Sequence, residues 1–238
     1  MPHPRPRSLH VVASFVLAVA AFAVAQGDDP QALVDAGRFT EAVAAYDAAL
    51  AAAPDDASLL ALRARARVYR ADHEAGLSDA EREAAYEAAV ADAERAASLA
   101  PDDADAAFEL ARALGRTAQF RGVVQSLNLA GRMREALDRT LELDPNHASA
   151  WHASALWHAE VPWVAGGRTR EVVPSFERAV ELEPDVLGHR VAFARVLLAE
   201  EAYDRAAAQL EAAAALPAES FLARRDAEAV EALRAELP

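Results

Sequence analysis

The chain has 238 residues, a formal net charge of −14 and no cysteine. So acidic a surface repels phosphate backbones, which argues against nucleic acid as a partner, and the lack of cysteine excludes disulfides and thiolate metal sites. Alanine, leucine, glutamate and arginine dominate the sequence, and all four favour helices, so we expect an all-helical (all-α) protein.

Residues 1–25 have the layout of a secretory signal peptide. Arg5 and Arg7 precede an apolar run from Val11 to Ala25 that only Ser14 interrupts. The run is shorter than the ~20 residues that a stable membrane-spanning helix needs. We therefore expect cleavage and export to the periplasm or cell envelope, or secretion, with no stable membrane span in the mature chain. An uncleaved anchor is the alternative.

The stretch from Asp35 to Pro54 sets the pattern for the rest of the chain. Gly37 suits the end of one helix, and Pro54 ends the next. Between them, apolar residues recur at intervals of three and four, which places them on one stripe of a helix: Phe39, Ala42, Val43, Tyr46, Ala49 and Leu50. The same ending returns at four later prolines, which are Pro101, Pro145, Pro184 and Pro217. The chain is therefore built from repeats.

The spacing of Gly, aromatic, Glu-Ala, aromatic, Ala-Leu and Pro resembles the second half of a tetratricopeptide repeat (TPR). The resemblance covers most of residues 30–217 and implies a right-handed solenoid of helical hairpins with a concave groove. It departs from the family pattern at Glu201, where a turn glycine is expected. We divide the chain into a signal peptide (1–25), a first repeat with a truncated first helix (26–56), two TPR-like repeats with insertions (57–103 and 104–147), two further repeats (148–186 and 187–217) and a C-terminal capping helix (218–238).

Two local features refine this division. We expect a break in the third repeat from Gly115 to Arg121, because glycine weakens a helix interior. The final segment, Glu219 to Leu237, is amphipathic with a charged outer side, as the last helix of a stacked array requires.

The fourth repeat is the most distinctive. All three tryptophans lie between residues 147 and 163, together with three of the seven histidines. Its Pro162, Gly166-Gly167 turn and Phe176-x-x-Ala-Val-x-Leu pattern also resembles the periplasmic T component of TRAP transporters. That resemblance implies an accessory subunit of a solute-uptake system.

Chemistry-bearing motifs are scarce. The sequence has no phosphate loop, nucleophile elbow or dinucleotide turn. His147 and His158 stand ~16 Å apart along a helix, too far for one ion with ~2 Å bonds. A metal or catalytic site around His152, His158 and Glu160 would need partners from another helix, and packing beside tryptophan is the other interpretation. We expect no catalytic residue, no metal and no cofactor.

The TPR resemblance places certain side chains on the concave groove: Arg65, Phe108, Arg112, Trp151, His152, Trp163 and Arg195. The arginines would attract a carboxylate or an acidic peptide, and the aromatic residues would exclude water. Alternatively, Arg65, Arg112 and Arg195 pair with glutamates between repeats.

The sequence therefore predicts an exported, non-enzymatic scaffold that binds another protein or an extended peptide. The alternatives are an accessory subunit of a TRAP-type uptake system, and an enzyme or metal-binding protein that uses the fourth repeat. No oligomeric state follows from the sequence.

Overall fold

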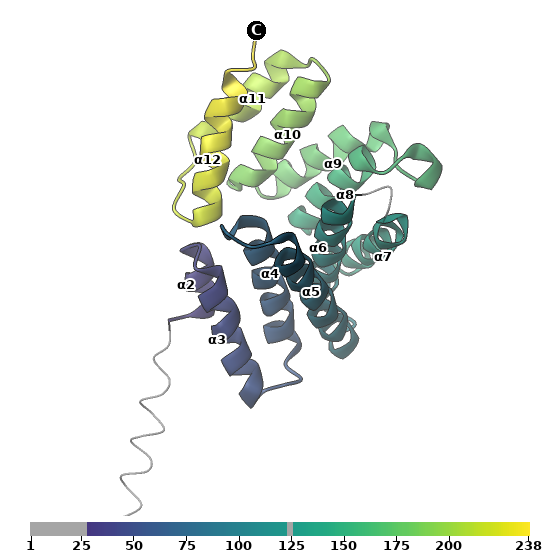
Figure 1. Ribbon diagram of the computed structural model, residues 1–238. Helices are drawn as coiled ribbons and strands as arrows, with labels where there is room; N and C mark the ends of the chain where they lie inside the picture. Colours follow the sequence, from purple (N-terminus) through teal and green to yellow (C-terminus); the bar gives the residue numbers. More distant parts are fainter. Residues whose placement is uncertain (1–27, 123–125) are drawn as a thin grey trace, which may run out of the picture.

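The computed structural model describes residues 28–122 and 126–238 (Figure 1). The predicted signal peptide, residues 1–25, lies outside the described residues. The described part consists of eleven α-helices and one short 3₁₀ helix, without a β-strand, so the predicted all-helical class is confirmed. Within it, no helix combines the length and the apolar character that crossing a membrane requires.

Consecutive helices pack side by side as hairpins, pairing α2 with α3, α4 with α5, α6 with α7, α8 with α9, and α10 with α11. Their bounds are α2 (Pro30–Asp35), α3 (Phe39–Ala52), α4 (Ala57–His73), α5 (Asp79–Leu99), α6 (Ala104–Arg121), α7 (Leu127–Leu143), α8 (Ala148–Glu160), α9 (Thr169–Leu182), α10 (Leu187–Ala199), α11 (Tyr203–Ala214) and α12 (Phe221–Arg234), with the 3₁₀ helix η2 (Trp163–Ala165) between α8 and α9.

Short polar side chains start several helices. Asp56 accepts a hydrogen bond from the backbone N–H of Leu59 and so caps α4. Ser78 and Glu81 form a reciprocal capping box at the start of α5. Such bonds satisfy N–H groups that a helix end leaves unpaired. These caps mark where α4 and α5 begin.

The hairpins pack closely because alanine lines their contacts. Ala66 of α4, Ala89 of α5 and Ala111 of α6 are fully buried, and the largest buried side chains, such as Phe176, fill the remaining space. Small side chains let helix axes approach, and the larger ones complete the core. The core consequently runs along the array as several adjoining clusters.

The predicted break from Gly115 to Arg121 is wrong. Helix α6 continues through this segment to Arg121. A Cβ atom on Gly115 would lie 2.7 Å from the sulfur of Met133 on α7. The glycine therefore allows α6 and α7 to pack closely, a role that outweighs its low helix propensity.

The turn between α10 and α11 accounts for the departure at Glu201. The φ angle of Glu201 is +58°, which lies in the left-handed region that Gly37 also occupies at +79°. Both turns close with the same pair of backbone bonds: Gly37 N–H to Val34 O and Arg38 N–H to Leu33 O in one, Glu201 N–H to Leu198 O and Ala202 N–H to Leu197 O in the other. Glu201 thus adopts the glycine conformation at a steric cost.

The last helix contacts the beginning of the array as well as its end. Helix α12 packs on α10 and α11 and also touches α2 (Figure 1). The Phe221 ring lies edge-on to Phe39, with 5.3 Å between ring centres, and 5.8 Å from His73. We call the contact of Phe221 with Phe39 and His73 the seam. It joins the two ends of the array and gives α12 a position that a simple terminal cap would not have.

Candidate functional site

The inner face of the array contains a cavity of about 600 Å³. Side chains from α4, α6, α7, α8, α10 and α12 line it. Aliphatic and aromatic groups form much of the wall, among them Val68, Phe108, Met133, Leu156, Val191 and Leu222. The polar lining residues include Asp72, His73, Arg112, Arg116, His152, Glu160, His189, Arg195, Arg225 and Asp226. A concave, largely apolar site with a few polar groups is typical of ligand pockets.

The structure places four of the seven predicted groove residues in this wall: Phe108, Arg112, His152 and Arg195. The other three lie outside the lining that the described residues form. Trp151 is partly buried, and its indole N–H donates to the carbonyl of Pro145 at 2.9 Å. Trp163 sits in η2 with 83% of its surface exposed. Arg65 is engaged in an ion pair instead.

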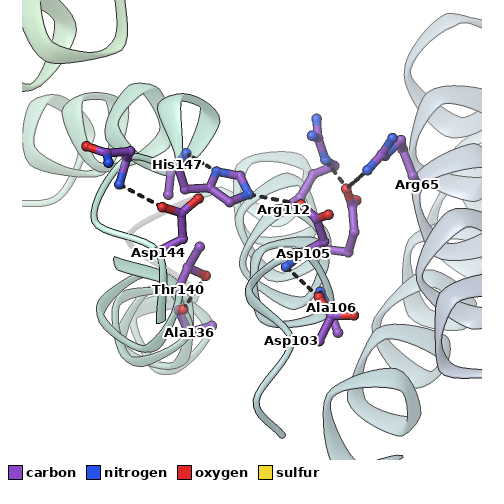
Figure 2. Close-up of polar contacts among 12 residues, drawn as sticks. Arg65, Asp103, Asp105, Ala106, Arg112, Ala136, Thr140, Asp144 and His147 are labelled. Carbon is purple, nitrogen blue, oxygen red and sulfur yellow. Dashed lines mark hydrogen bonds and ion pairs between the residues drawn. The ribbon is translucent and has the colours of Figure 1, made fainter. Parts of the chain in front are cut away.

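Arg65 and Arg112 point toward each other from α4 and α6 (Figure 2). The carboxylate of Glu109, only 1% exposed, lies between them. Arg65 Nε donates to Glu109 Oε1 at 2.8 Å, and Arg112 Nε donates to Oε2 at 2.9 Å. For Arg65, the alternative interpretation, pairing with a glutamate, is therefore the one that the structure shows. Arg112 also pairs with Glu109, but its guanidinium lies in the cavity wall as well, 4.7 Å from the ring centre of Phe108.

The cavity is lined by three further arginines, of which, in the described part of the chain, one is paired with a carboxylate and two are not. Arg116 forms an ion pair with Asp72 at 2.7 Å. Arg195 and Arg225, in contrast, have no carboxylate within ion-pairing distance among the described residues. Burial raises the pKa of nearby Asp226 above its usual value, against the opposing effect of these two arginines. The end of the cavity formed by α10 and α12 therefore holds two arginines outside any ion pair among the described residues, with the carboxyl of Asp226 near both.

Two histidines meet in the wall between α8 and α10. The Nδ1 atoms of His152 and His189 are 3.0 Å apart, and His189 Nε2 lies 3.2 Å from Glu183 Oε2. Burial, together with His189 and Arg112, lowers the pKa of His152 to about 3. Burial also lowers the pKa of His189, although Glu183 opposes the shift. Both imidazoles are therefore neutral at physiological pH.

The residues considered for a metal or catalytic site have separate partners. His158 Nε2 lies 3.1 Å from a guanidinium nitrogen of Arg134, and Glu160 accepts hydrogen bonds from Gln119. In residues 28–122 and 126–238, no three histidine, aspartate or glutamate side chains are grouped to hold an ion. His147 caps α8, since its Nδ1 accepts from the N–H of Ala150, and its Nε2 faces Asp105, as Figure 2 shows.

Sequence reasoning missed several residues that matter here. Trp157 is the buried tryptophan, 6% exposed, and its indole N–H donates to the carbonyl of Ala130 at 2.8 Å. A Cβ on Gly166 would lie 3.1 Å from the Trp157 ring, a contact that depends on the fold of the turn and that sequence spacing alone does not reveal. His189 and Arg225 carried no local signal, since each depends on the helices that the fold brings beside it.

Comparison with known proteins adds a family and a fold. Residues 28–164 match the model of the family described as Regulator of microtubule dynamics protein 1-3, which is more than half of the chain. No curated protein matches the chain significantly.

Among solved structures, a thermophilic TPR protein of Thermus thermophilus is similar over 91% of this chain and 96% of its own, with 19% identity and a TM-score of 0.64. MamA is similar over 79% of this chain and 93% of its own, with 16% identity and a TM-score of 0.48. The first likeness concerns the fold alone and confirms the predicted TPR-like solenoid of helical hairpins. The match across 28–164 goes further: the chain belongs to the Regulator of microtubule dynamics protein 1-3 family.

Proposed function

We propose that this protein is an exported, non-enzymatic scaffold that binds a short acidic segment of a partner protein or peptide in its central cavity. The observation that carries the proposal is the pair Arg195 and Arg225, two cavity arginines without a carboxylate partner among the described residues. In a chain of net charge −14, such a pair concentrates positive potential at one place. Arginine binds carboxylates through two parallel hydrogen bonds, which fixes a ligand's orientation.

The shape of the site supports a short ligand. Its volume of about 600 Å³ lies within the range of small-ligand and peptide pockets, roughly 300–1,000 Å³. Helix α12 contributes Leu222 and Arg225 to the wall, which α4 and α6 also line. A few extended residues fit such a space, whereas a folded domain does not. Export follows from the layout of residues 1–25, and the proposed location is the periplasm or cell envelope.

The family's name refers to microtubule dynamics in the proteins for which it is named. Our proposal for this chain rests on the cavity instead. It involves no reaction chemistry, and three of the polar groups of the wall already have partners: His152 contacts His189, Asp72 pairs with Arg116, and Glu160 accepts from Gln119.

The test measures binding of dye-labelled hexapeptides by fluorescence anisotropy, using peptides rich in Asp and Glu and matched peptides with Asn and Gln. We expect the acidic peptides to bind the wild-type protein and to lose most of that binding in Arg195→Glu. Arg195 is the better residue to change, because Arg112→Glu would place a second carboxylate beside Glu109. Arg170→Glu is the matched control, since Arg170 lies outside the cavity and its side chain is 79% exposed. Equal binding of the neutral peptides, or undiminished binding by Arg195→Glu, would contradict the proposal.

A further inference from the structure

The hydrogen bonds of His152 and His189 in the cavity wall determine which ring nitrogen of each histidine carries the proton. Glu183 contributes a carboxylate, which can only accept hydrogen bonds, so His189 carries its proton on Nε2 and donates it to Glu183 across 3.2 Å. A neutral His189 then has a lone pair on Nδ1. The 3.0 Å contact between the two Nδ1 atoms requires one donor, and His152 must supply it. His152 is therefore protonated on Nδ1 and has a lone pair on Nε2.

That lone pair is available in the cavity. His152 belongs to the lining, and its Nε2 has no hydrogen-bond partner among the described residues. It is also not sealed from solvent, unlike Nδ1 of His158, which is buried without a partner. The ring is held from a second side by an edge-on contact with Phe176, whose ring centre lies 5.4 Å away. The acceptor is thus fixed in position and orientation.

A donor lies on the neighbouring inner helix. Arg112 uses Nε for Glu109 and Nη1 for the hydroxyl of Tyr69 at 3.3 Å. Its Nη2 has no partner in the part of the chain that the structure describes. Arg112 lines the same cavity as His152, and its positive charge contributes to the lowered pKa of His152. The wall therefore offers one free donor and one free acceptor on successive inner helices, α6 and α8.

We infer that the chain of hydrogen bonds from Glu183 through His189 makes His152 Nε2 an obligatory acceptor, so that this part of the cavity selects a group with an N–H donor and a carbonyl acceptor, as in an amide. A carboxylate ion complements Arg112 but brings its own lone pairs against those of His152. The backbone amide of an extended peptide fits both. This inference deepens the proposed function: Arg195 and Arg225 bind the acidic side chain, and Arg112 and His152 bind the backbone beside it.

The first experiment needs no ligand. Long-range ¹H–¹⁵N correlation spectra of the ¹⁵N-labelled protein report which nitrogen of each histidine carries the proton. At neutral pH we expect His152 protonated on Nδ1 and His189 protonated on Nε2. Glu183→Ala removes the acceptor that fixes the tautomer of His189, so the His152 signals should move toward the Nε2–H form. Glu181→Ala, at an exposed position in the last turn of α9 just before Glu183, should leave them unchanged. Finding His152 as the Nε2–H form in the wild-type protein would overturn the inference.

The second experiment uses hexanamide and hexanoate as probes, followed through the His152 ring signals during titration. One hydrogen bond retained or lost in such a site corresponds to roughly tenfold in affinity, so hexanamide should bind about tenfold more tightly than hexanoate. The preference should shrink in Glu183→Ala and persist in Glu181→Ala. Equal or tighter binding of hexanoate at His152 would refute the inference. The two proposals fail separately, because acidic hexapeptides can bind whatever the tautomer of His152, and that tautomer can be measured whether or not the peptides bind.

Discussion

Glu109 provides the sharpest test of how the inner wall is held. Its carboxylate is 1% exposed and bonds Arg65 on one side and Arg112 on the other, so it joins α4 to α6. Glu109→Ala removes the only carboxylate shared by these two guanidinium groups among the described residues. The positive charges of Arg65 and Arg112 then remain partly buried without the carboxylate that neutralises them.

The expected cost follows from the burial of the partners. Breaking a fully buried ion pair by removing one member costs ~3–5 kcal/mol. Arg65 and Arg112 keep side-chain exposures of 27% and 23%, so water can reach each of them in part. Arg112 also retains its contacts with Tyr69 and Phe108. We therefore expect a loss of about 2–4 kcal/mol in the free energy of unfolding. For a chain of this length, that loss lowers Tm by roughly 4–16 °C.

Thermal and urea unfolding followed by circular dichroism measure this loss. The matched control is Glu177→Ala, which breaks an ion pair with Arg205 between α9 and α11 whose side chains are 57% and 51% exposed. That change should cost less than ~1 kcal/mol. Adding Arg112→Ala to Glu109→Ala should cost less than the sum of the two single changes, because it removes one unpaired charge. A Glu109→Ala variant no less stable than Glu177→Ala would refute the reasoning.

Three further predictions follow from the described geometry. Trp157→Ala should cost ~3–5 kcal/mol, because it empties a buried site, whereas exposed Trp163→Ala should stay within about 0.5 kcal/mol; chemical unfolding measures both. Glu201→Gly should raise the free energy of unfolding by about 0.5–1 kcal/mol, since it relieves a left-handed residue, and an unchanged or lower Tm would count against that strain. His152, with a folded pKa of about 3, binds fewer protons than in the unfolded chain, where its pKa is ~6.5. Stability should therefore fall as the pH drops below that unfolded value, and His152→Asn should weaken the dependence, as unfolding titrations between neutral and acidic pH would report.

The sequence predicted the hairpins because their signals are local. Pro54, Pro101, Pro145 and Pro184 each follow a helix by two residues, and the apolar stripes between them have the helical period. Gly115 misled the prediction, because its local preference opposes the helix while its contact with Met133 on another helix favours it. Local propensity is a weak guide where packing decides.

The site was only partly predictable for the same reason. The repeat pattern placed Phe108, Arg112, His152 and Arg195 on the inner face, where they line the cavity. It could not distinguish Trp151 from Trp157, because the partner that anchors Trp157 is a backbone carbonyl on the preceding hairpin.

Ion pairing and end contacts were also hard to foresee. The carboxylate of Glu109 lies three residues before Arg112, so their pairing was visible in principle from helix spacing. The approach of Phe221 to Phe39 was not, since it depends on the summed curvature of all the hairpins.

That approach ties the number of hairpins to the contact between the two ends of the array. In an open solenoid each unit touches only its neighbours, so units can be gained or lost with little effect elsewhere. Here an added or deleted hairpin would carry α12 away from α2 and leave Phe39 and His73 without the ring of Phe221. The number of hairpins is thus coupled to a contact between the two ends of the array, as the number of blades is in a closed propeller.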